Sequence, residues 1–354
     1  MKFLLNKEEE NKLVALFNQY DTNLDYDYYA FKIIFDGDDM EEEKAQTLAM
    51  AKTPLEKKNL YFDLLEKKYP ANNDFIKKNI RYETQILSAK DFMANPYVKA
   101  LQNVSFKEGD YRLEHNVIKA YTLCSYGEEY PYGANYAMNM AMAMFDGDIS
   151  YPAIYDNGLE SIPLSPYEIR TLEVPIALAK GNVLLLGLGI GYYAYMASLK
   201  DEVKKINIVE LDGKLIDVFN KYLLPLFPHP EKIHIHHLNP YLFFDTIKDK
   251  KFDFIFANLW QGPSYGVSSY FKIKHHFDSF KYTRCVYRLE NSILNYLRDK
   301  VIDAMKQEYY QTYDDRDDID SYIVSSLENY EIHDSNDIDS LLNVSGLYKL
   351  FLDY

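Results

Sequence analysis

Apolar side chains recur at helical spacing in the first hundred residues of the chain. Leu13, Phe17 and Tyr20 lie three or four residues apart, and Leu60 and Leu64 repeat that spacing. Such a period places apolar side chains on one face and predicts short amphipathic helices. Each helix must stop or restart near the prolines at positions 54, 70 and 96.

The pattern changes after about residue 105. The segments 111–114 and 117–123 are rich in strand-forming side chains, which predicts two strands. Turn-forming glycines follow, among them Asp146-Gly147 and Asn157-Gly158. We therefore predict a small β-rich segment between the helical region and the rest of the chain.

From residue 182 onward, strand patterns alternate with helix patterns. Val183-Leu184-Leu185-Leu186 is a continuous apolar run, typical of a strand that is buried on both faces of a parallel sheet. The predicted strands are 183–186, 206–209, 233–236, 252–256 and 284–287, and the predicted helices are about 192–200, 212–222, 240–248, 266–278 and 290–310.

Strands joined by helical crossovers predict an α/β fold with a doubly wound, mostly parallel, Rossmann-like sheet. An acidic and helical tail follows the last predicted strand and its helix. The predicted parts of the chain are a helical region over 1–104, a β-rich connector over 105–175, and a nucleotide-binding domain with its helical tail over 176–354.

The composition narrows the class of protein. With 54 acidic against 39 basic residues, the net charge of -15 disfavours nucleic acid and anionic membrane surfaces as partners. Two distant cysteines, Cys124 and Cys285, indicate neither a disulfide framework nor a thiolate zinc site. No stretch approaches the roughly 20 apolar residues of a membrane helix. We expect a cytoplasmic protein with no membrane partner, and the sequence leaves a homo-oligomer open.

Three glycines follow the buried strand at 183–186. Gly187, Gly189 and Gly191 lead into a predicted helix, and glycines there let backbone amides approach a ligand closely. Glu210 ends the next strand, where a carboxylate is placed to accept hydrogen bonds from ribose hydroxyls. The loop and the carboxylate together predict an adenosine-type ligand.

The spacing of the glycines favours one ligand. A dinucleotide fingerprint, Gly-x-Gly-x-x-Gly, needs glycine at position 192, where the chain has Tyr192. We therefore favour S-adenosylmethionine over NAD, and a purely structural loop remains a third interpretation.

These segments resemble the class I S-adenosylmethionine-dependent methyltransferases, in particular the branch of spermidine-synthase-like proteins. The similar stretch is about 182–262, with Val183 to Gly191 as the first family motif and Val209-Glu210-Leu211-Asp212 as the second. The resemblance implies that Glu210 holds the ribose and that Leu211 packs on the adenine. The candidate cofactor-binding residues are Gly187, Gly189, Gly191, Tyr192, Glu210, Leu211 and Asn239.

Two asparagines depart from the family pattern. Asn239 stands where the family has an aspartate that holds the adenine amino group, and an amide oxygen can still accept that hydrogen bond. Asn258 stands where aminopropyltransferases have the aspartate that removes a proton from the attacking amine. An amide cannot be a general base, which argues against polyamine synthesis.

Methyl transfer needs alignment of donor and acceptor more than it needs a strong base. We predict that Asn258 orients the acceptor and that Trp260 stacks on it or shields the cation. The competing interpretation makes Trp260 a core anchor and Asn258 a turn or cap residue. Tyr167 and Glu168 are candidate residues for binding the substrate.

Several histidines lie close in sequence, including His234 and His236. No carboxylate is spaced to complete a metal site with them, so we predict no metal. The sequence as a whole predicts a methyltransferase that uses S-adenosylmethionine and acts on a small-molecule acceptor. An aminopropyltransferase and a catalytically inert nucleotide-binding module remain the alternatives.

Overall fold

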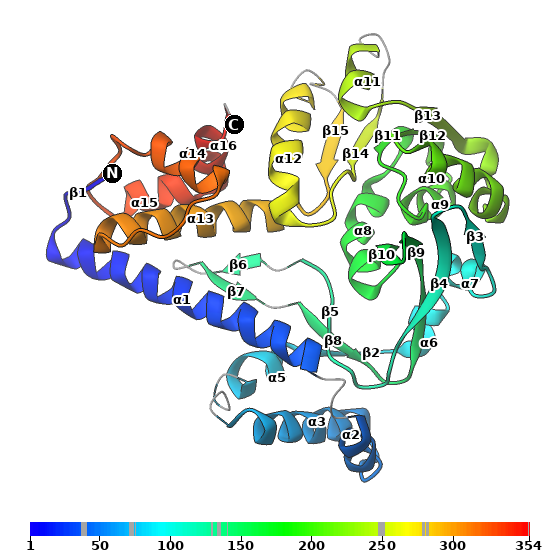
Figure 1. Ribbon diagram of the computed structural model, residues 1–354, viewed down its shortest axis with the longest axis horizontal. Helices are drawn as coiled ribbons and strands as arrows, with labels where there is room; N and C mark the ends of the chain where they lie inside the picture. Colours follow the sequence, from blue (N-terminus) through cyan, green and yellow to red (C-terminus); the bar gives the residue numbers. More distant parts are fainter. Residues whose placement is uncertain are drawn as a thin grey trace.

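The computed structural model shows a mixed α/β protein in which a parallel sheet lies at one side and a group of long helices at the other (Figure 1). The α/β class predicted from the sequence is confirmed. The structure describes residues 1–36, 41–70, 74, 76–128, 130–132, 136–139, 141–246, 252–277, 280, 283–352 and 354.

Five parallel strands form the sheet that carries the glycine loop. They are ordered β13-β12-β11-β14-β15, so the strand order reverses beside β11. Leu186, at the end of β11, lies between Val209 of β12 and Ala257 of β14. All five strands were predicted near their observed positions, which are Gly181–Leu186 (β11), Val203–Glu210 (β12), Ile233–His237 (β13), Phe254–Ala257 (β14) and Arg284–Tyr287 (β15).

Both faces of β11 are buried, as its continuous apolar run predicts. Val183 and Leu185 face one hydrophobic cluster, whereas Leu184 and Leu186 face another. The first cluster includes residues of α9 and α10, and the second includes residues of α12 and α13. Helices follow the strands near every predicted position, namely Tyr192–Ser198 (α9), Gly213–Val218 (α10), Pro240–Thr246 (α11), Pro263–Phe277 (α12) and Glu290–Tyr310 (α13).

An antiparallel sheet of order β10-β9-β4-β3 precedes the parallel one. The predicted strand at 111–114 is confirmed, but the separate strand at 117–123 is wrong: one strand covers residues 111–118 and ends before Tyr121, which adopts φ +57°. Asn157 and Gly158 form the predicted tight turn, both with positive φ. The strands of this sheet are Phe106–Glu108 (β3), Tyr111–Ile118 (β4), Ile149–Asp156 (β9) and Leu159–Pro163 (β10).

Shorter strands and helices complete the first half of the chain. As the prolines predict, α3 begins at Pro54 and α7 at Pro96. The other elements are Glu41–Leu48 (α2), Pro54–Lys68 (α3), Ile76–Ile80 (η3), Arg81–Glu83 (α5), Gln85–Leu87 (β2), Ala89–Met93 (α6), Pro96–Leu101 (α7), Cys124–Ser125 (β5), Tyr130–Tyr132 (β6), Ala137–Asn139 (β7), Met142–Phe145 (β8) and Pro166–Leu178 (α8).

The first helix is longer than predicted. Helix α1 spans Lys7–Asp36, 30 residues, because neither glycine nor proline interrupts its apolar period. Leu13, Leu16 and Phe17 pack in the same cluster as Ile302 and Met305 of α13, so the two long helices lie side by side (Figure 1). The division of the chain at residues 104 and 175 stays a prediction.

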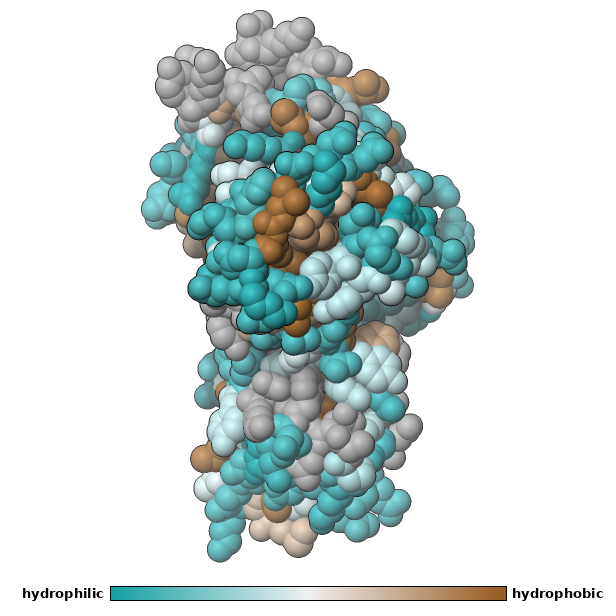
Figure 2. Space-filling model, turned by 90° about the vertical axis from the view of Figure 1, so that its left-hand side faces the viewer, coloured by the Kyte–Doolittle hydropathy of each residue, from teal (hydrophilic) through white to brown (hydrophobic). Residues whose placement is uncertain are grey.

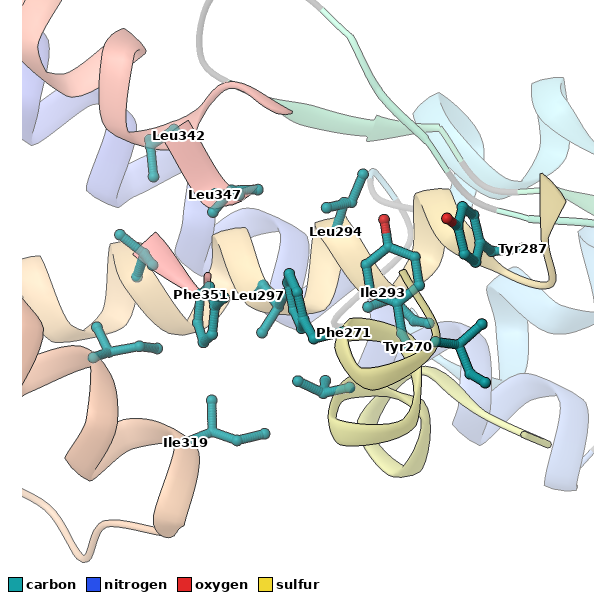
Figure 3. Packing of buried hydrophobic residues seen from close by; sticks show 14 of the residues in the cluster. Tyr270, Phe271, Tyr287, Ile293, Leu294, Leu297, Ile319, Leu342, Leu347 and Phe351 are labelled. Atoms are coloured by element: carbon teal, nitrogen blue, oxygen red, sulfur yellow. The ribbon is translucent and has the colours of Figure 1, made fainter. Parts of the chain in front are cut away.

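The C-terminal helices extend the same cluster. Figure 3 shows Phe271 of α12 and Phe351 near the C-terminus side by side next to α13, and their rings are stacked with centroids 5.6 Å apart. This packing confirms the helical tail, formed by Asp318–Ser326 (α14), Ser335–Leu342 (α15) and Val344–Leu350 (α16), with Lys2–Phe3 (β1) paired to Glu331–Ile332 (β16).

The side of the molecule that lies at the left in Figure 1 is mostly hydrophilic, with a small exposed group of hydrophobic side chains (Figure 2). Within the described ranges, none of the helices is both long enough and apolar enough to cross a membrane.

Candidate nucleotide-binding site

The glycine loop follows β11 directly, and two of its glycines are required by close contacts. Gly187 has φ +89°, and a Cβ there would lie 2.2 Å from the backbone oxygen of Asn258. Gly191 has φ +88°, and a Cβ there would lie 2.6 Å from a ring carbon of Phe219. Any other residue at either position would therefore meet both backbone strain and a steric clash.

Gly189 has a different environment. Its φ is +56°, but a Cβ there would lie no closer than 3.8 Å to its nearest neighbour, the side-chain nitrogen of Asn258. The backbone of the loop is thus open on this side, and Gly187 and Gly189 both line a cavity.

Glu210 ends β12 and holds the loop in place. Its Oε2 accepts the backbone N–H of Leu188 at 2.8 Å, while Oε1 accepts those of Leu211 and Asp212 at 2.8 and 2.9 Å. A carboxylate offers about four acceptor positions, so three bonds leave room for a further donor. The side chain lines the same cavity as the glycines.

The cavity lies at the carboxyl ends of β11, β12 and β14, and its volume is about 580 Å³. This is within the usual range for cofactor sites. Gln261 donates a hydrogen bond to the backbone oxygen of Ser161 at 2.9 Å, so the β9–β10 hairpin forms one of its walls. The predicted site residues that line the cavity are Glu168, Gly187, Gly189, Glu210, Leu211, Asn239, Asn258 and Trp260.

Leu211 and Asn239 lie at the Glu210 end of the cavity. Leu211 is 59% exposed and leaves an apolar surface free for a ligand. The side-chain oxygen of Asn239 accepts the backbone N–H of Tyr241 at 2.9 Å, at the start of α11. Asn239 therefore supports this helix start in addition to lining the cavity.

Asn258 and Trp260 follow β14 and are held by the same arginine. The Asn258 side-chain oxygen accepts a hydrogen bond from Nη1 of Arg288 at 3.0 Å. The Trp260 ring is only 4% exposed, and its Nε1 donates to the backbone oxygen of Arg288 at 2.7 Å. Trp260 thus has the contacts of a core anchor and also borders the cavity.

Arg288 also forms an ion pair with Glu168, which comes from the first turn of α8. The Arg288 and Glu168 side chains are 9% and 16% exposed. Burial raises the pKa of the Glu168 carboxyl, and the adjacent guanidinium only partly offsets this. Arg288 was not among the predicted site residues, although it follows the fifth predicted strand just as Asn258 follows the fourth.

Three of the predicted residues lie outside this cavity. Tyr192 is 4% exposed, and its hydroxyl accepts a hydrogen bond from the Asn95 side chain at 3.0 Å. Tyr167 lines a separate cavity of about 380 Å³, which also contains Asp27 and Asp299. Gly191 packs against the Phe219 ring and does not line the cavity.

The charges around the cavity are unequal. Glu160, Glu168 and Glu210 line it, whereas Arg288 is its sole cationic side chain among the residues described. The excess of carboxylates favours a ligand that carries positive charge. In the part of the chain that the structure describes, no three His, Cys, Asp or Glu residues are grouped to hold a metal ion.

No protein-family model and no curated protein matches the chain. Among solved structures, it is similar to the crystal structure of spermidine synthase from Thermotoga maritima, with 17% sequence identity and a TM-score of 0.29. The match covers 39% of this chain and 49% of that chain, about half the length of the solved protein. The strand order and the site geometry described above do not depend on this likeness.

Proposed function

We propose that the cavity binds S-adenosylmethionine and that the protein is a methyltransferase acting on a small-molecule acceptor. The observation that carries this proposal is the meeting of Gly187, Gly189 and Glu210 at one cavity, beside the strand where the sheet order reverses. In open α/β sheets, ligands bind outside the carboxyl ends of the strands at such a reversal. The same order supports the doubly wound, Rossmann-like description of the sheet.

The residues present suit an adenosine with a cationic substituent. Glu210 has an acceptor position left for the ribose hydroxyls, and Leu211 and Asn239 offer an apolar surface and an amide for the adenine. Gly189 leaves space where a side chain would project. The surplus of carboxylates suits a sulfonium.

S-adenosylmethionine supplies an electrophilic methyl group when it is bound. The chain itself contributes positioning: Asn258, fixed by Arg288, lines the cavity, and the β9–β10 hairpin forms one of its walls. This division of roles suits a displacement that depends on alignment.

The first experiment is a calorimetric titration with S-adenosylmethionine, decarboxylated S-adenosylmethionine and NAD. We expect Glu210→Ala to weaken binding of the adenosyl ligands by at least about 1–3 kcal/mol, because charge-assisted hydrogen bonds are lost. Glu202→Ala is the matched control, since it removes an exposed carboxylate from the turn that precedes the same strand, at the end away from Glu210. Unchanged affinity in Glu210→Ala contradicts the assignment.

Catalysis is tested separately from binding. Protein incubated with S-adenosylmethionine and mixed small-molecule acceptors should release S-adenosylhomocysteine faster than protein without acceptor. Tight binding with no turnover in a broad acceptor screen would support the inert module instead. Product formed with putrescine and the decarboxylated donor would support the aminopropyltransferase.

A further inference from the structure

Arg288 carries a hydrogen-bond donor that no group in the described part of the chain satisfies. The residue is 9% exposed, and its Nε is buried without an acceptor. Its two terminal nitrogens are engaged, Nη1 with Asn258 at 3.0 Å and Nη2 with Glu168. A guanidinium has five N–H groups, and the described residues accept only two of them, so Arg288, which lines the cavity, has donors left for the acceptor of a ligand.

Glu168 has a hydrogen-bond acceptor that complements the donors of Arg288. Its Oε1 accepts the bond from Arg288, while Oε2 accepts no hydrogen bond from the described residues. The carboxylate is 16% exposed and lines the cavity together with the guanidinium. A cationic group of a ligand that binds beside Arg288 and Glu168 can therefore donate to Oε2 of Glu168, which the ion pair already holds in position.

An α-amino-acid group carries a matching acceptor and donor side by side: its carboxylate can accept from Arg288, and its ammonium can donate to Glu168. We infer that the Arg288–Glu168 pair binds the α-amino-acid end of S-adenosylmethionine, with Arg288 donating to the carboxylate and Glu168 accepting from the ammonium. The inference rests on the proposed function and deepens it, because it identifies which adenosyl donor the site selects.

The position of the pair suits this role. Strands β12 and β15 are separated by β11 and β14, so their backbones lie about three strand spacings, roughly 14 Å, apart. Glu210 projects from one side of this gap, and Arg288 reaches from the other side as far as Asn258. The Asn258 amide in turn lies 3.8 Å from the Cβ position of Gly189. A ligand with its ribose at Glu210 thus extends along the glycine loop toward the pair.

The test compares three adenosyl compounds that differ only around the sulfur substituent. S-adenosylmethionine carries the ammonium and the carboxylate, its decarboxylated form carries the ammonium alone, and methylthioadenosine carries neither. We expect the wild-type protein to bind S-adenosylmethionine at least about tenfold more tightly than the decarboxylated form, as expected for one added charge-assisted bond. Equal affinity for these two compounds overturns the inference.

Variants separate the two halves of the pair. Arg288→Met should bring the affinities of S-adenosylmethionine and its decarboxylated form within about threefold of each other, because only the carboxylate contact is lost. Glu168→Gln should weaken both of these ligands by at least about tenfold while leaving methylthioadenosine unchanged. Arg288→Lys is the second variant if Arg288→Met does not fold; it keeps the charge but loses the fork of donors, so it should reduce the same selectivity.

Leu211→Ala, at the other end of the cavity, is the matched control and should weaken all three compounds alike. A uniform loss across the three compounds in Arg288→Met or Glu168→Gln overturns the inference while adenosyl binding stands. Binding of none of the three compounds by the wild-type protein overturns the proposed function itself, together with the inference that rests on it.

Discussion

Two of the three carboxylates that line the cavity in the described part of the chain, Glu210 and Glu168, are held in different ways. Glu210 accepts three backbone N–H groups, two of them from the residues that follow it directly. Glu168 accepts from a guanidinium 120 residues away, in a buried setting that raises its pKa. The first carboxylate stabilises the loop that surrounds it. The second lies where burial disfavours its charged form and the guanidinium of Arg288 only partly offsets this, and such shifted carboxyls are often found at ligand sites.

The largest effect should come from the glycine loop that Glu210 supports. Gly187→Ala should destabilise the protein by about 3–5 kcal/mol, because left-handed backbone strain adds to a clash with the backbone of Asn258. Denaturant unfolding measures the change. Gly109→Ala is the control, since Gly109 has φ +57° but nothing within 4 Å of its Cβ position, and it should cost only about 1 kcal/mol. Equal losses in the two variants would show that the contact with Asn258 contributes nothing.

Glu210 should contribute to the stability of the protein even without ligand. Glu210→Gln should lower the free energy of unfolding by about 2 kcal/mol, because an amide replaces a charged acceptor of three backbone N–H groups. Glu202→Gln, in the turn just before the same strand and 73% exposed, should change it by less than about 0.5 kcal/mol. If the two substitutions have the same effect, Glu210 has no structural role.

Glu168 should behave differently, and its effect should depend on pH. Its pKa is raised in the folded protein, so the stability that its protonated form contributes is fully present below the usual value of 4.5 and is lost as the pH rises through the raised pKa. Glu168→Gln imitates the protonated form and can still accept from Arg288. We expect the variant to match the wild type near pH 4 and to gain stability relative to it toward neutral pH.

Chemical unfolding at several pH values measures this difference. Glu173→Gln, on the same helix and 44% exposed, is the control and should show little change with pH. A loss of about 3–5 kcal/mol in Glu168→Gln at neutral pH, as found when a favourable buried ion pair is broken, would show that the charged form of Glu168 stabilises the fold and would contradict this prediction.

The two ends of the cavity also differ in how well the sequence predicts them. The strands near Val183 and Ile206 were predicted because parallel strands buried on both faces require apolar runs. The glycine loop and Glu210 follow directly from those strand ends, so their meeting was predictable. Arg288 was not predicted, because its partners Glu168 and Asn258 lie on separate elements and no local pattern links them.

Other differences between the prediction and the structure also come from packing between elements far apart in the sequence. Tyr192 follows the glycine loop in sequence but turns into the core, where its hydroxyl meets Asn95. The length of α1 was underestimated because periodicity predicts a helical face and says little about where a long helix ends. The helix that packs against it, α13, does not begin until Glu290.

By itself the sequence determined the strand and helix alternation, the glycine loop and the carboxylate at the end of β12. These features depend on side chains a few residues apart, whose spacing fixes local backbone geometry. Only the tertiary structure decided that α1 packs on α13, that Trp260 is buried and that Glu168 meets Arg288. Such contacts form when elements far apart in the sequence pack together, so the local spacing of residues does not predict them.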